Sequence, residues 1–192
     1  MAARIHASPL WQRRRLPALA LLLIAVAFAS VACSATPPPR WQEGGAPLLI
    51  APARWDRANG DHIEIKANGQ VLDNGDPVLF IDRAGRVTDE SYEPVAILLP
   101  DGYVAGTDNR LLGRVGVTNA APPGSATAWF SILPNGQVMR FDADGDRENA
   151  GVWHGCSGPL MRTCTLVTHI LLVQSYANRP NPTVGVGIGI GF

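Results

Sequence analysis

The chain has 192 residues, which is enough for one folded domain and a targeting segment. Hydrophobic residues make up 46% and charged residues 17%, a balance typical of a folded domain and not of a disordered chain. Lysine plus arginine equals aspartate plus glutamate at 16 each, so no basic face is indicated and nucleic acid is excluded as the expected partner. The 20 glycines and 16 prolines favour turn-rich β structure over a helical bundle.

The N-terminus has the organisation of an export signal. Three arginines at positions 13–15 precede an apolar run over 16–32, which ends in small residues before Cys33. The segment Ser30-Val31-Ala32-Cys33 resembles the lipobox of bacterial lipoproteins. That resemblance implies cleavage after residue 32, a diacylglycerol thioether and an N-acyl chain on Cys33. Ser34 in the next position implies an outer-membrane address.

Lipidation would attach the chain stably to a membrane, because several acyl chains bury many methylene groups. The alternatives are an ordinary cleaved signal peptide, which would give a soluble periplasmic or secreted protein, and an uncleaved anchor. Prolines at 37–39 predict that residues 33–45 form an extended, semi-rigid tether. Residues 46–192 are then predicted to form a single β domain.

A Gly-x-Val marker repeats within residues 63–141. It begins at positions 69, 85, 102 and 136, so three copies are spaced by about 16 to 17 residues and the fourth lies about two periods on. Short apolar arms alternate with Asn-Gly and Asp-Gly turn signals, and the arms show no helical period. The pattern predicts an all-β fold, an antiparallel meander of short hairpins closed into a small sandwich or barrel. A β-solenoid is the alternative geometry, but two-residue turns favour antiparallel neighbours.

Two groups of residues in the body are candidates for ligand binding. Trp129 and Trp153 would suit an aromatic platform for a sugar or peptide, with core packing as the alternative. Asp142, Asp144 and Asp146 alternate in a short loop, an arrangement that can supply oxygens to calcium. Residues 142–146 resemble the start of an EF-hand loop, and a solvated hairpin loop is the alternative. No other metal site and no cofactor is predicted.

The cysteines are predicted to divide between two roles. With Cys33 lipidated, Cys156 and Cys164 are left as a pair, and an exported chain predicts a disulfide between them. His154 stands near Cys156, as in a cysteine–histidine catalytic pair, but no third, orienting residue can be assigned.

The C-terminal part contains two apolar segments. Residues 166–173 are predicted to form a central strand, with His169 as a satisfied strand residue and not a ligand. Residues 184–192 alternate glycine with apolar residues and end in Phe192, which resembles the C-terminal strand of outer-membrane β-barrels. That resemblance implies a membrane-inserted β assembly as an alternative to a buried closing strand.

The sequence therefore predicts a non-enzymatic envelope lipoprotein with a structural or binding role. An envelope protein or glycan is the expected partner, besides the membrane that holds the lipid. Two alternatives remain open: an exported hydrolase that uses Asp142, Asp144, Asp146 or His154, and membrane insertion through the glycine-rich tail.

Overall fold

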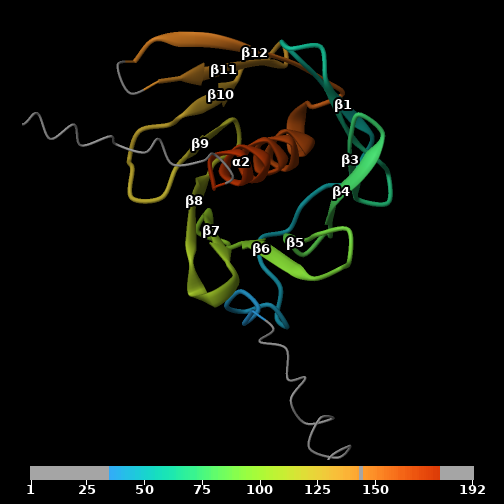
Figure 1. The fold of residues 1–192 in the computed structure, drawn as a ribbon, viewed down its shortest axis with the longest axis vertical. Coiled ribbons are helices and arrows are strands. Elements are labelled where there is room, and N and C mark those ends of the chain that lie inside the picture. The colour runs from blue at the N-terminus through green and yellow to red at the C-terminus, as the bar shows by residue number, and fades with distance from the viewer. Residues whose placement is uncertain (1–34, 143–144, 178–192) are drawn as a thin grey trace, which may run out of the picture. The chain divides into compact units, whose positions relative to one another are not determined.

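The computed structural model describes residues 35–142 and 145–177. Within these ranges, twelve strands follow one another in a single antiparallel sheet, and the last strand pairs with the first to close a barrel (Figure 1). The strands are β1 (Ala53–Arg57), β2 (His62–Ile65), β3 (Gln70–Asp73), β4 (Asp76–Ile81), β5 (Arg86–Thr88), β6 (Pro94–Leu98), β7 (Tyr103–Gly106), β8 (Leu111–Val115), β9 (Asn119–Ala121), β10 (Phe130–Ile132), β11 (Gln137–Phe141) and β12 (Arg147–His154). The 3-10 turn η1 (Thr107–Asn109) lies between β7 and β8. Strand β12 is followed by the 3-10 turn η2 (Gly158–Leu160) and helix α2 (Met161–Ala177).

The Gly-x-Val repeat is a repeat of hairpins. At the first marker, the Gly69 amide donates to the Lys66 carbonyl at 2.9 Å, and the Gly69 carbonyl accepts a 2.8 Å bond from the Ile81 amide of β4. Gly69 has a φ of 87°, and a Cβ there would lie 2.0 Å from the Ile81 carbonyl oxygen, so only glycine fits. The marker valines at 71, 87, 104 and 138 are all fully buried inside the barrel. The predicted antiparallel meander is confirmed, and the solenoid alternative is excluded.

The structure contains one repeat unit that lacks the Gly-x-Val marker and was therefore not detected in the sequence. The Thr118 carbonyl accepts from the Ile132 amide at 2.6 Å, as each marker glycine does from its own partner strand, and Ala120 is buried in the place of the valine. Residues 119–121 form β9, and the longer connection to β10 begins after Ala121. The strands also extend beyond the predicted 63–141 block, from β1 to β12.

The barrel has two different ends. The end where β2–β3, β4–β5, β6–β7, β8–β9 and β10–β11 are joined carries the repeat turns, and we call it the glycine end. The end where β1–β2, β3–β4, β5–β6, β7–β8, β9–β10 and β11–β12 are joined we call the loop end.

Helix α2 lies inside the ring of strands (Figure 1). Eight consecutive residues, 163–170, are buried, so every face of the helix is enclosed. The predicted strand over 166–173 is therefore wrong. A closed sheet has no free edge for another strand, whereas a helix satisfies its own backbone groups and can fill the interior. An apolar run buried on all sides shows no period that would distinguish the two.

The threonines of α2 have partners inside the barrel. The Thr163 hydroxyl donates to the Leu49 carbonyl at 2.7 Å, and the Thr165 hydroxyl donates to the Val117 carbonyl at 2.7 Å. Both carbonyls belong to segments at the glycine end, so these bonds fix the start of the helix there. A buried hydroxyl without a partner would be unfavourable, and these bonds remove that penalty.

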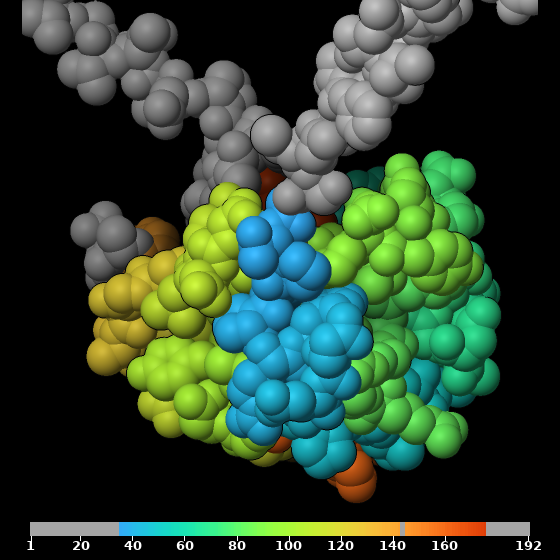
Figure 2. Space-filling model, turned by 90° about the horizontal axis from the view of Figure 1, so that it is seen from below, coloured from blue at the N-terminus to red at the C-terminus, as the bar shows by residue number. Residues whose placement is uncertain are grey.

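Residues 35–52 lie along the barrel and then across its glycine end (Figure 2, blue). The Thr36 amide donates to the Asp108 carboxylate at 2.9 Å. Further on, the Ala46 amide donates to the Leu98 carbonyl at 2.7 Å, and Ala46 is fully buried. The prediction that 33–45 is an extended tether is therefore wrong for residues 35–45, because polar backbone contacts hold this segment on the barrel.

The predicted disulfide between Cys156 and Cys164 is confirmed, with the two Cα atoms 6.3 Å apart. It joins the chain after β12 to the first turns of α2. Cys33 and the glycine-rich segment 184–192 lie outside the described residues. Among the helices of the described ranges, none has the length and apolar character needed to cross a membrane.

Candidate functional site

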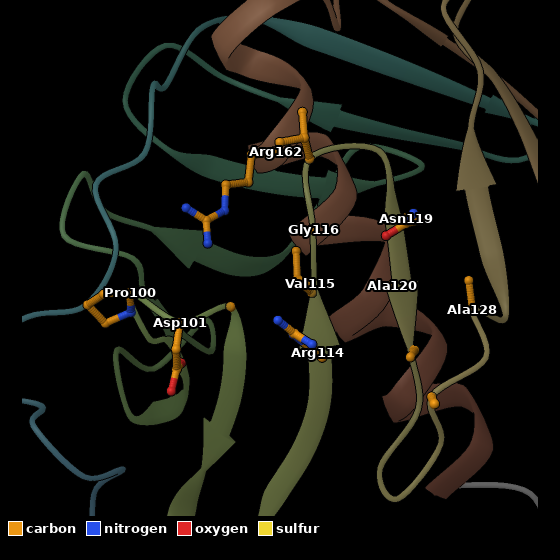
Figure 3. Close-up of a pocket in the computed structure, with 13 residues that line it drawn as sticks. Pro100, Asp101, Arg114, Val115, Gly116, Asn119, Ala120, Ala128 and Arg162 are labelled. Atoms are coloured by element: carbon orange, nitrogen blue, oxygen red, sulfur yellow. The ribbon is translucent and has the colours of Figure 1, made fainter.

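A surface hollow of about 420 Å³ lies at the glycine end, between the β6–β7 turn and the β8–β9 turn. Arg114 on β8 and Arg162 in the first turn of α2 both line it, and their guanidinium groups point into it (Figure 3). Small residues and backbone form much of the remaining wall, including Gly102 and Gly116. We call this hollow the arginine pocket.

The arginine pocket has a cationic character. Within residues 35–142 and 145–177, neither guanidinium has a carboxylate at ion-pair distance. Arg114 lies over the Tyr103 ring, with its guanidinium carbon 5.6 Å from the ring centroid, which holds the side chain against the sheet. Asp101 also lines the pocket, and its carboxylate accepts the Tyr103 amide at 3.1 Å, so the two guanidinium groups outnumber the one carboxylate of the lining. Two such guanidinium groups suit a carboxylate or phosphate.

The tryptophan platform is not formed. Trp153 is 2% exposed and stacks on Trp55 at 5.8 Å, and its indole N–H donates to the Thr168 hydroxyl at 3.0 Å. Trp55 and Trp153 face each other across the β1–β12 pair that closes the barrel. Trp129 is half-buried, and its indole N–H donates to His169. The core alternative therefore holds for Trp153, and its ring is not available to a ligand.

The acidic loop between β11 and β12 is a capped turn. The Asp142 carboxylate accepts the Asp146 amide at 2.8 Å, and the Asp142 amide donates to the Asp146 carbonyl at 3.2 Å. Asp144 lies outside the described residues. Among the residues that are described, no three histidine, cysteine or acidic side chains are grouped so as to hold a metal ion.

His154 lies far from the acidic loop. It ends β12, whereas Asp146 directly precedes that strand, and an eight-residue strand spans roughly 25 Å. The His154 ring is paired with the Asp56 carboxylate at 3.2 Å on the exposed outer face of the barrel. Cys156 is in the disulfide and has no thiol. His154 is therefore not brought into one cleft with the acidic loop, whose Asp142 and Asp146 together line a separate small hollow.

His169 is buried and fully bonded, as predicted, but on a helix and not on a strand. Its Nδ1 accepts the Trp129 indole N–H at 3.2 Å, so Nε2 carries the proton and donates to the Leu112 carbonyl at 2.9 Å. A Cβ on Gly113 would lie 2.7 Å from this ring, so the glycine permits its close approach to β8. Burial lowers the pKa of His169 to about 4.

Nothing in the sequence indicated the arginine pocket, because Arg114 lies on a strand and Arg162 on a helix that the sequence did not predict. Comparison with protein-family models, with curated proteins and with solved structures finds no match to this chain. Its function must therefore be argued from the fold and from this pocket.

Proposed function

We propose that the chain is an exported, non-enzymatic lipoprotein of the bacterial outer membrane, anchored through Cys33, and that the arginine pocket binds an anionic group of an envelope glycan or protein. The observation that carries the binding role is the convergence of Arg114 and Arg162 on one hollow without a carboxylate partner among the described residues. The support for the anchor is the lipobox-like sequence before Cys33.

The filled interior supports a role on the outer surface of the barrel. Helix α2 occupies the space that a ligand would take in an empty barrel of this size, and its buried polar side chains are engaged in internal bonds. Binding must then use the exterior, where the arginine pocket combines a concave shape with charge. Guanidinium groups donate in a planar fork that matches carboxylate and phosphate oxygens.

Mass spectrometry of the N-terminus, on protein taken from a membrane fraction, tests the anchor. We expect a chain that begins at a triacylated Cys33, and a Cys33→Ser variant that is released from the membrane. A free N-terminus beyond Cys33 would contradict lipidation and would identify a soluble exported protein.

An NMR titration with citrate and with inorganic phosphate tests the pocket. We expect the amide signals of Gly102 and Gly116 to shift, and the shifts to be lost in Arg162→Gln. Arg83→Gln is the matched control, because Arg83 is exposed, lies in a neighbouring turn of the glycine end and does not line the pocket. Equal shifts in Arg162→Gln and in Arg83→Gln would show that the anion is not held by the pocket.

A further inference from the structure

We propose that the arginine pocket is one end of a longer trough along the outer face of β8, and that this trough binds an acidic polysaccharide. A sugar ring packs against Tyr103, and acid groups of the same chain bind Arg114 and Arg162. This binding mode rests on the proposed function, since it takes the arginine pocket as the anion-binding site. It narrows the partner from an envelope glycan or protein to an extended, negatively charged glycan.

A second hollow, of about 380 Å³, adjoins the arginine pocket. Arg114, Ala121 and Ala126 line both, so the two hollows meet at these residues. The second hollow continues past Tyr103 to Leu111, where β8 begins at the loop end. We call the two hollows together the β8 trough. A strand of five residues rises by about 3.4 Å per residue, so the trough extends for roughly 17 Å and is too long for a single small anion.

The shape of the β8 trough follows from the sizes of neighbouring side chains. Arg114 pairs with Tyr103 of β7 on one side and with Ala121 of β9 on the other. Arginine and tyrosine extend from the outer face of the sheet, whereas alanine leaves a depression beside them. The connection between β9 and β10, residues 122–129, begins directly after Ala121 and forms the opposite wall beside β8 (Figure 3).

The wall formed by the β9–β10 connection is held by backbone hydrogen bonds. The Ser125 amide donates to the Pro122 carbonyl at 3.2 Å and closes a turn. The Trp129 amide donates to the Ala120 carbonyl at 3.0 Å and returns the chain to the barrel. A wall that is already ordered loses little conformational freedom when a ligand binds, which lowers the cost of binding.

The charge of the β8 trough is predominantly positive along its length. Arg162 and Arg114 lie toward the glycine end, and the exposed Arg110 directly precedes β8 at the loop end. Among the described residues, none of these three arginines has a carboxylate at ion-pair distance. Asp101 is the one acidic side chain in the described lining, and the Asp108 carboxylate near Arg110 accepts a backbone amide of the N-terminal segment at 2.9 Å. Separated guanidinium groups suit a ligand with repeated acid groups.

The closed sheet favours a polysaccharide over a peptide as the occupant. An extended peptide commonly binds by pairing with a free strand edge, and each of the twelve strands that the structure describes already has a neighbour on both sides. A helical ligand needs an apolar groove, whereas arginines, Asn119 and Ser125 line this one. A sugar chain needs neither, because its rings present apolar C–H faces to an aromatic ring and hydroxyls to polar groups. Tyr103, 42% exposed, supplies the aromatic ring.

Calorimetry with oligosaccharides of defined charge tests the proposal on the full-length protein in detergent. The probe is tetragalacturonate, and the comparisons are galacturonate, the neutral maltotetraose and a tetraglutamate peptide. We expect tetragalacturonate to bind at least about tenfold more tightly than either galacturonate or maltotetraose, because several linked groups engage the trough at once. Equal affinities for tetragalacturonate and galacturonate would overturn the proposal. A tetraglutamate peptide that binds as tightly as tetragalacturonate would overturn the assignment to a polysaccharide.

Two substitutions of tyrosine test the sugar contact. Tyr103→Leu keeps an apolar side chain and should lower the ratio of tetragalacturonate affinity to inorganic phosphate affinity at least about fivefold, because the aromatic face is lost. Tyr92→Leu is the matched control, since Tyr92 is exposed in the β5–β6 turn and lines neither hollow. An unchanged ratio in Tyr103→Leu, or an equal loss in Tyr92→Leu, would overturn the contact between the ring and the sugar.

Inorganic phosphate separates failure of the trough from failure of the proposed function. Phosphate binding that depends on Arg162, with tetragalacturonate held no more tightly than galacturonate, would refute the trough alone. Phosphate and tetragalacturonate affinities that are both unchanged in Arg162→Gln would refute the anion-binding role of the arginine pocket, and the trough with it.

Discussion

Acidification should destabilise the protein through His169. Burial lowers the pKa of this residue to about 4 from its ordinary value of 6.5, which it regains in the unfolded chain. Between these two values the unfolded state binds more protons, so the free energy of unfolding falls as the pH falls. The stabilisation is complete above pH about 6.5; about 2 kcal/mol is lost by pH 5 and about 3 kcal/mol by pH 4, below which the loss levels off.

The assay is urea unfolding of the wild type and of His169→Gln at pH 7.5, 5 and 4. The variant lacks the titrating ring and should be less stable at pH 7.5, because the bonds to Trp129 and Leu112 are disturbed. The difference between the two proteins should then shrink by about 3 kcal/mol between pH 7.5 and pH 4. Contributions from the exposed histidines and from the carboxylates are common to both proteins and cancel. A difference that stays constant with pH would refute the reasoning.

Two further sets of substitutions test the close backbone approach at Gly69 and the disulfide between Cys156 and Cys164. Gly69→Ala should lower the free energy of unfolding by several kcal/mol or prevent folding, since its Cβ would lie 2.0 Å from the Ile81 carbonyl oxygen. Gly75 also has a positive φ but faces open space, so Gly75→Ala should lower it by only about 1 kcal/mol. Thermal unfolding of both variants measures the difference. Equal costs would show that the close approach is not limiting. Cys156→Ser with Cys164→Ser should lower the free energy of unfolding by about 2 to 3 kcal/mol, measured in denaturant against the wild type with and without reductant. A wild type that reductant leaves unchanged would contradict this contribution.

The sheet could be predicted because its code is local. Each Gly-x-Val marker combines a turn glycine with an inward valine two residues later. The local backbone conformation alone requires these residue types at these positions. The same local code failed at Thr118, where a two-residue turn between Gly116 and Asn119 removes the need for glycine. The repeat unit still forms at Thr118, because its carbonyl accepts the Ile132 amide as the marker glycines do from their partner strands. This backbone bond cannot be read from the sequence.

The helix and the arginine pocket could not be predicted because they depend on long-range contacts. Apart from His169, residues 163–170 are apolar or threonine, a composition that also suits a strand, and only the closed sheet around them selects the helix. The tryptophan platform failed for the same reason: Trp153 is inward only because β12 pairs with β1. Arg162 reaches Arg114 only once α2 has entered the barrel.

The closure of the barrel has a consequence for how the chain folds during its synthesis. The partners Arg54 and His154 belong to the first and last strands, and the helix that fills the interior follows both. Until that C-terminal segment has been made, the hairpins have no interior to pack against and no closed ring to join. Contacts between such distant positions make folding slow, and an incomplete sheet is prone to aggregate. The closed, filled barrel can therefore form only after α2 has been synthesised.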